Sequence, residues 1–127
     1  MAEVSLSVLL DSVIVIDHFN GIPAATEYIS KMQGRLAISV ITRAEVLTGL
    51  EGNDRRAATR LLDRFPTLII DRDIADLAAT LRRQNRWKLP DALQAALAKH
   101  HKLKLATRDS ADFPPKRYRF AVVPYSL

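Results

Sequence analysis

The stretch Ser5-Leu6-Ser7-Val8-Leu9-Leu10-Asp11 indicates the fold more clearly than any other part of the chain. A short apolar run that ends at an acidic residue is typical of a buried parallel strand that enters a turn. Asp11 then lies at the carboxyl end of this strand, and we expect a short helix over residues 12–19 directly after it. The chain therefore begins as a strand followed by a helix.

The same order of strand and helix continues along the sequence. Apolar runs predict further strands at residues 36–40, 67–70, 103–107 and 120–123. Apolar residues at helical spacing, bounded by Pro, Gly and acidic residues, predict helices at 24–33, 42–50, 55–65, around 74–81 after a cap at Asp71 or Asp73, and 91–101. This alternation predicts an α/β fold in which helices cover both faces of a parallel sheet through right-handed crossovers.

Length and composition predict one globular domain over residues 1–127. Hydrophobic residues make up 48% of the 127 positions, and no charge block or low-complexity tract interrupts them. No apolar run approaches the roughly 20 residues of a membrane span, and the first residues lack the basic region of a signal peptide. We therefore expect a cytoplasmic protein with no membrane association.

The absence of cysteine limits the chemistry of any site. Without cysteine there is no disulfide, no thiolate-bound zinc and no Cys nucleophile, so a metal would be held by oxygen or imidazole. The 19 Lys and Arg against 14 Asp and Glu give a net charge of +5, which favours polyanionic partners but is also explained by solubility. The basic residues are spread along predicted helices, at Arg55, Arg56, Arg60, Arg64, Arg82, Arg83, Arg86 and Lys88.

Acidic residues recur at the predicted ends of strands. Asp11, Glu45 and Asp109 follow strands, and Asp91 lies in the first turn of the helix before the fourth strand. In an open parallel sheet the site lies outside the carboxyl ends of the strands, so these side chains are expected at one rim. Because clustered carboxylates repel each other, a divalent cation would offset the cost, and an all-oxygen set favours Mg²⁺ or Mn²⁺.

Each of three carboxylates also has an ordinary structural interpretation. Glu45 would complete a capping box with Thr42, Asp91 would interact with a helix N-terminus, and Asp109 would cap a turn. Caps alone give no reason for all of these residues to lie at the same rim. The combination therefore favours a metal site.

Four stretches together resemble the PIN-domain nucleases, and more narrowly the VapC-type toxins of bacterial toxin–antitoxin pairs. They are residues 9–17 (LLDSVIVID), 38–47 (ISVITRAEVL), 89–96 (LPDALQAA) and 106–113 (ATRDSADF). The resemblance covers nearly the whole chain in the family's order. It implies a three-layer α/β/α sandwich around a mostly parallel sheet, a Mg²⁺ or Mn²⁺ site, cleavage of RNA, and a homodimer or a hetero-oligomer with a VapB-like antitoxin.

Carried over by position, Asp11, Glu45, Asp91 and Asp109 match the four acidic residues of the family, and Ser12 matches the hydroxyl residue beside the first. Val13 departs from the family, which often has Asn there. Asp112 lies close to Asp109 in the same loop; either would supply the fourth carboxylate, and Asp109 is preferred. Asp17 follows Asp11 by about a turn and a half of helix, so we expect a structural role for it.

The predicted chemistry is hydrolysis of an RNA phosphodiester by water at the acidic site. His100 and His101 are expected at the C-terminus of a helix as surface residues rather than as a catalytic base. Arg43 and Arg108 neighbour the predicted ligands in sequence and are candidates for holding substrate phosphates.

Two other functions use the same residues. The first is a non-catalytic PIN-like RNA-binding or scaffold module, which the acidic set argues against because negative charge repels phosphates. The second is an enzyme for DNA or small phosphate compounds.

The resemblance also implies an antitoxin segment that sends a basic side chain into the acidic pocket. An apolar groove beside the pocket would receive the rest of that segment. Candidate lining residues are Leu47, Leu50, Leu61 and Leu62, although the same pattern is typical of ordinary core.

Overall fold

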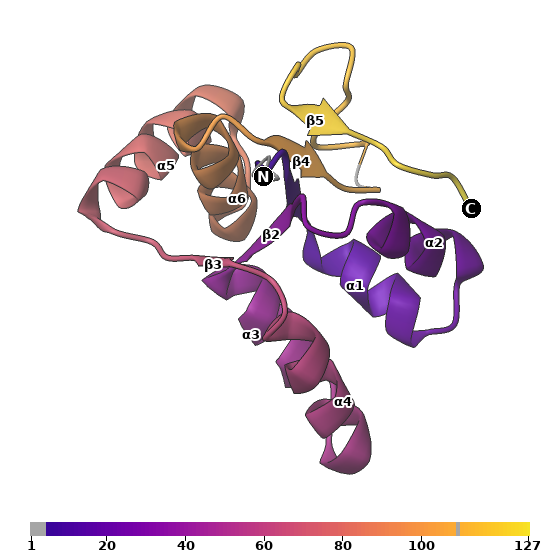
Figure 1. The fold of residues 1–127 in the computed structure, drawn as a ribbon. Helices are drawn as coiled ribbons and strands as arrows, with labels where there is room; N and C mark the ends of the chain where they lie inside the picture. The colour runs from indigo at the N-terminus through magenta and orange to yellow at the C-terminus, as the bar shows by residue number, and fades with distance from the viewer. Residues whose placement is uncertain (1–4, 109) are drawn as a thin grey trace.

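The computed structural model describes residues 5–108 and 110–127 (Figure 1). The strands in the described part are β1 (Val8–Leu10), β2 (Leu36–Ser39), β3 (Thr67–Leu68), β4 (Lys104–Ala106) and β5 (Ala121–Val122). The helices are α1 (Ser12–Phe19), α2 (Pro23–Lys31), α3 (Val40–Thr48), α4 (Gly52–Leu62), α5 (Arg72–Asn85) and α6 (Leu89–His100). The predicted alternation of strands and helices is therefore confirmed.

The strands form one parallel sheet in the order β3-β2-β1-β4-β5. Val8 pairs with Leu36 of β2 on one side and with Lys104 of β4 on the other. After β1 the chain adds β2 and β3 on one side and then returns to add β4 and β5 on the other. The strand order thus reverses beside β1, which places the expected site at the carboxyl ends of β1 and β4.

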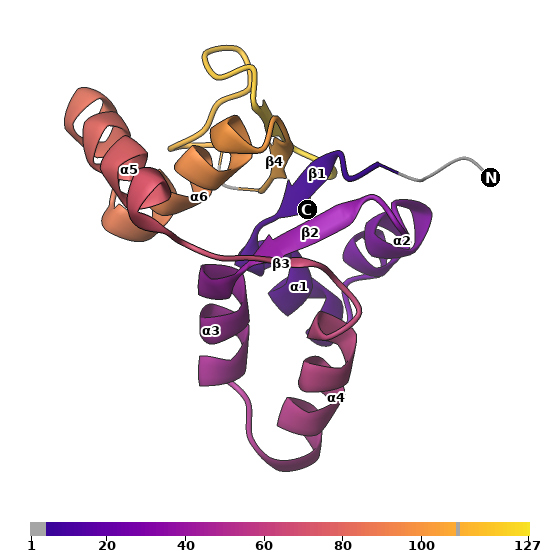
Figure 2. The ribbon, with the colours of Figure 1, turned by 60° about the vertical axis from the view of Figure 1, so that its left-hand side comes forward.

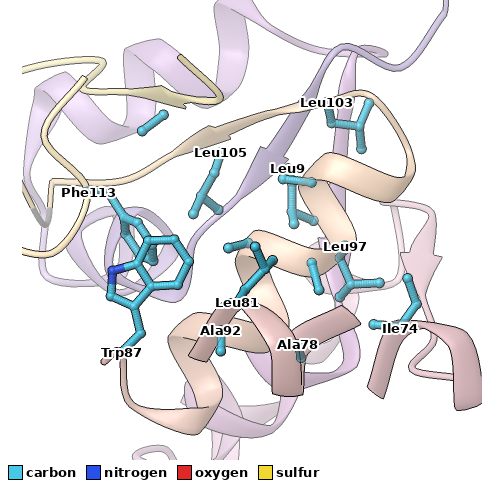
Figure 3. Close-up of a cluster of buried hydrophobic side chains, with 14 of the residues drawn as sticks. Leu9, Ile74, Ala78, Leu81, Trp87, Ala92, Leu97, Leu103, Leu105 and Phe113 are labelled. Atoms are coloured by element: carbon cyan, nitrogen blue, oxygen red, sulfur yellow. The ribbon is translucent and has the colours of Figure 1, made fainter. Parts of the chain in front are cut away.

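Successive residues of the central strands point to opposite faces and supply two separate cores. Leu9 and Leu105 pack with α5 and α6, in a cluster that also contains Trp87 (Figure 3). Leu10 and Ile38 pack on the other face with residues of α1, α2, α3 and α4. Figure 2 shows the sheet between these two groups of helices. The three-layer α/β/α sandwich is therefore confirmed.

The start of α3 corrects one prediction. This helix begins at Val40, and its N-cap is Ser39, whose hydroxyl oxygen accepts the Thr42 N–H at 3.0 Å. Thr42 therefore lies inside the helix, and the expected capping box between Thr42 and Glu45 is wrong. Glu45 needs another explanation.

The other boundaries differ by a few residues, and the paired part of each strand is shorter than its apolar run. In the described ranges, no helix combines the length and the apolar character that a membrane crossing requires.

Candidate active site

Asp11 lies at the point where the strand order reverses. It directly follows β1 and is the N-cap of α1, where its Oδ1 accepts the Ser12 N–H at 2.9 Å. Its Oδ2 accepts the hydroxyl of Thr107 at 2.7 Å, and Thr107 directly follows β4. The two neighbouring strand ends therefore hold one carboxylate between them.

Glu45 is brought to Asp11 by α3. Partial burial and the negative charge of Asp11 raise the pKa of the Glu45 carboxyl, while a hydrogen bond with the Ser12 side chain lowers it. The repulsion from Asp11 means that the two acidic side chains lie near each other although 34 positions separate them in the sequence. Ser12, predicted as an additional site residue, links them through its backbone to Asp11 and its side chain to Glu45.

A buried polar network supports Asp11 from the side of α6. The side-chain amide nitrogen of Gln94 lies 2.9 Å from the Thr42 hydroxyl oxygen and 3.4 Å from Oδ1 of Asp11. The Thr42 hydroxyl in turn donates to the carbonyl oxygen of Leu10, the last residue of β1. Helices α3 and α6 are thereby tied to the end of the central strand.

The structure gives fewer contacts for the other predicted carboxylates, Asp91, Asp109 and Asp112. Asp91 lies in the first turn of α6, three residues before Gln94, so the two residues share one side of the helix. Asp109, the preferred fourth carboxylate, lies outside the described residues. Asp112 is exposed, and its backbone carbonyl accepts the indole N–H of Trp87 at 3.2 Å.

The two arginines proposed to hold phosphate both form ion pairs. Arg108 binds Asp17 with two hydrogen bonds, of 2.5 and 2.9 Å, and the Tyr125 hydroxyl donates to the same carboxylate at 2.7 Å. Asp17 is only 3% exposed, and the Arg108 guanidinium holds the pKa of its carboxyl below the usual value of 3.8. These contacts agree with the expected structural role of Asp17. Arg43 pairs with Asp63 at 2.9 Å, and an RNA contact stays a prediction for both arginines.

The two histidines His100 and His101 lie where the sequence predicts. His100 is in the last turn of α6 and His101 is its C-cap, and both are exposed.

The chemistry of the donors fits a hard divalent cation. Asp11 and Glu45 provide carboxylate oxygens at one rim, and the Gln94 side-chain oxygen is buried there without a hydrogen-bond partner among the described residues. Such oxygens bind Mg²⁺ and Mn²⁺, or accept hydrogen bonds from the water molecules on these ions, and suit them better than Zn²⁺. Residues 5–108 and 110–127 alone contain no group of three or more Asp, Glu or His side chains arranged to hold a metal ion. Asp11, Glu45 and Asp91 do not form such a group by themselves, and Asp109 lies outside the described residues.

Sequence reasoning missed three members of the site: Thr42, Gln94 and Thr107. Thr107 could have been found from its place, because it follows β4 in the way that Asp11 follows β1. Gln94 could have been found as the polar position inside the apolar run Ala92-Leu93-Gln94-Ala95.

Comparison with known proteins identifies the family. The sequence model of the PIN domain matches residues 8–116. The chain is 38% identical over 114 residues to Ribonuclease VapC10 of Mycobacterium tuberculosis, covering 84% of this chain and 86% of that protein.

Solved structures agree with this relationship. A toxin–antitoxin complex from Klebsiella pneumoniae contains a chain with a TM-score of 0.86 and 36% identity, which covers 95% of this chain and 100% of its own length. FitAcB from Neisseria gonorrhoeae shares the fold, with a TM-score of 0.79 at 23% identity over 94% of this chain and 99% of its own. This chain belongs to the PIN domain family, among its VapC-type members.

Proposed function

We propose that this protein is a metal-dependent endoribonuclease that hydrolyses RNA phosphodiester bonds and acts as the toxin of a toxin–antitoxin pair. One observation supports this most strongly: Asp11 and Glu45, from separate strand–helix units, lie close enough at the reversal point of a parallel sheet for the charge of Asp11 to raise the pKa of the Glu45 carboxyl. The relative named as a ribonuclease and the related chain in a toxin–antitoxin complex support the same function.

The residues that would hold Mg²⁺ or Mn²⁺ are Asp11, Glu45, Asp91 and Asp109. A divalent cation at this place supplies positive charge for the phosphoryl oxygens and polarises a water molecule. The chain itself contributes orientation: the Ser12 N–H and the Thr107 hydroxyl fix the two oxygens of Asp11. Ser12 also hydrogen-bonds Glu45, so this one residue contacts both carboxylates.

An RNA-cleavage assay tests the catalytic part. Partner-free protein is incubated with RNA and with a DNA of matched sequence in the presence of Mn²⁺, beside an Asp91→Asn variant. We expect discrete RNA products with the wild-type protein and none with the variant. Equal cleavage of DNA would point to a general nuclease, and RNA binding without cleavage or ion binding would point to a non-catalytic module.

An apolar hollow beside Glu45 supports the antitoxin part of the proposal. A cavity of about 150 Å³ is lined by Ile16 and Phe19 of α1, by Glu45 and Val46 of α3, and by Asn20, Gly49 and Leu50 directly after these helices. Leu50 and Ile16 line this cavity and Ile16 is 39% exposed, whereas Leu62 is fully buried in the core. An antitoxin segment with an apolar residue beside a basic one fits this hollow, because the basic side chain would reach the carboxylates.

The hollow can be tested with a matched pair of variants. We expect Ile16→Asp to weaken the complex with the proposed antitoxin and to relieve inhibition of RNA cleavage by that antitoxin. Ile69→Asp is the control, because Ile69 is also exposed, at 68%, but lies in the segment between β3 and α5. Equal effects of the two variants would contradict the assignment of the hollow.

A further inference from the structure

Gln94 is an unusual residue for its position in α6. Its side chain is 2% exposed, and the buried residues around it on the helix are Ala92, Ala95, Ala96 and Leu97. An apolar side chain would fill this position without burying polar atoms, and burying a polar group without all its hydrogen bonds is unfavourable. A glutamine here is therefore explained better by a role at the site than by packing.

The hydrogen bonds determine how the Gln94 amide is oriented. The Asp11 carboxylate can only accept, and the Thr42 hydroxyl gives its hydrogen to the Leu10 carbonyl, so its oxygen is left to accept. Both neighbours therefore require a donor, which is the NH₂ group of Gln94. The side-chain oxygen of Gln94 must then point away from Asp11 and Thr42.

That oxygen is the one buried side-chain nitrogen or oxygen in the described part of the chain that lacks a hydrogen-bond partner. It belongs to the amide whose nitrogen lies 3.4 Å from Oδ1 of Asp11. A buried acceptor of this kind is satisfied by a hydrogen-bond donor such as an ordered water molecule.

We propose that Gln94 is a positioning residue of the metal site. Its amide nitrogen holds Oδ1 of Asp11 against Thr42 and the end of β1, and its amide oxygen, on the opposite side of the amide, is left to accept a hydrogen bond from a buried water molecule. This inference rests on the proposed function, because it assigns Gln94 to the site where the ion is held. Residues that orient metal ligands in this way strengthen ion binding without touching the ion.

Calorimetric titration of the Gln94→Leu and Gln94→Met variants with Mg²⁺ alone tests the proposal. Gln84→Leu is the matched control, because Gln84 is an exposed glutamine of α5. We expect both Gln94 variants to bind Mg²⁺ about tenfold more weakly or worse. We also expect their melting temperatures to stay the same or rise, since an apolar side chain suits the surroundings.

The possible results separate this inference from the function on which it rests. If the Gln94 variants bind Mg²⁺ and cleave RNA as the wild type does, Gln94 has no positioning role and the proposed function stands. If they melt at lower temperature but bind Mg²⁺ normally, Gln94 serves packing only and the inference is wrong. If the wild-type protein binds no Mg²⁺, the metal-dependent function fails and the inference fails with it.

A measurement on the wild-type protein covers the case in which the variants do not fold. The side-chain NH₂ signals of glutamine are resolved by nitrogen-15 NMR, and this chain has only Gln33, Gln84 and Gln94. We expect Mg²⁺ to shift the Gln94 signals and to leave those of Gln84 unchanged. Backbone shifts at Asp11 without any shift of the Gln94 side chain would overturn the inference.

Discussion

Asp11 combines a structural and a chemical role in one side chain. Its Oδ1 accepts a hydrogen bond at the start of α1, as an N-cap does. A cap alone would not require the Thr107 hydroxyl on Oδ2 or the Gln94 amide near Oδ1. Donors from three separate segments fix the carboxylate in one orientation, which is what a metal ligand needs.

Asp109 and Asp112 can be distinguished by substitution. We predict that Asp109→Asn lowers the rate of RNA cleavage by about 10–100-fold, as loss of a ligand or its support does. Asp112→Asn is expected to leave the rate unchanged, because Asp109 is the residue that matches the fourth acidic position of the family. Initial rates of RNA cleavage with saturating Mg²⁺ measure the effect of each substitution. A larger loss of rate in Asp112→Asn than in Asp109→Asn would assign the fourth carboxylate to Asp112.

The ion pair between Asp17 and Arg108 predicts a stability that depends on pH. Folding lowers the pKa of Asp17 below its usual value of 3.8. The ionised Asp17 therefore contributes fully to the free energy of unfolding above pH 3.8, and this contribution is lost as the pH falls through the pKa of the folded protein. We expect Asp17→Asn to lower the free energy of unfolding by about 1.5–3 kcal/mol at neutral pH. The difference from wild type should shrink well below pH 3.8.

Urea unfolding of wild type and Asp17→Asn at neutral pH and at a pH well below 3.8 measures this difference in stability. Asp63→Asn is the control, because the exposed pair with Arg43 should contribute about 1 kcal/mol or less. A deficit of Asp17→Asn that is the same at both pH values would contradict the assignment.

Among individual residues, the sequence predicts the carboxylates of the site better than the residues that hydrogen-bond them. Asp11 and Glu45 could be placed because strand ends converge in a parallel sheet. Gln94 could not be paired with Asp11, because 83 positions separate them and contact depends on how α6 packs. Arg108 lies next to the site in sequence, yet its side chain binds Asp17. Because the Asp17 carboxylate is buried, it needs an ion-pair partner, and the sequence does not show that Arg108 is that partner.

Among the secondary-structure elements, the helix N-termini matter most for function. Helix α1 begins after Asp11, α3 is capped by Ser39, and α6 carries Asp91 in its first turn. Three helices therefore begin near the carboxyl ends of the strands, where their dipoles favour negative groups. The elements thus stabilise the same charges that a cation would bind.

The caps of α3 and α5 provide a matched pair of substitutions. Ser39 accepts the Thr42 N–H and Asp71 accepts the Ile74 N–H, at 3.0 and 2.9 Å. We expect Ser39→Ala and Asp71→Ala each to cost about 1 kcal/mol of stability. Only Ser39→Ala should also weaken Mg²⁺ binding, because Ser39 supports Thr42 and the polar network at Asp11. Calorimetric titration of both variants measures this, and equal Mg²⁺ affinities would contradict the link between α3 and the site.

The boundary of α3 shows why element ends are hard to predict. Both Ser39 and Thr42 suit an N-cap, and Thr42 has the glutamate three residues later that a capping box requires. Ser39 takes the role because the Thr42 hydroxyl is occupied by Leu10 and Gln94 from other elements. Local pattern identified the helix, and tertiary contacts decided its first residue.

For the whole molecule, two cores on opposite faces of one sheet imply cooperative folding. Leu9 and Leu10 are neighbours in β1 but belong to different cores, so neither core can form without the central strand. We propose that residues 1–127 form a single domain and predict one unfolding transition. Trp87, the only tryptophan, reports on one core, and circular dichroism reports on all the helices. Different midpoints for the two signals would contradict a single domain.

The central claim is that carboxylates from separate strand ends share one divalent cation. Crystals soaked in Mn²⁺ and measured for anomalous scattering would locate that ion directly. We predict one strong peak within ligand distance of Asp11, with Glu45 and Asp91 around it, and its loss in Asp11→Asn crystals. A Mn²⁺ peak elsewhere, or no peak at Asp11 under saturating Mn²⁺, would contradict the claim.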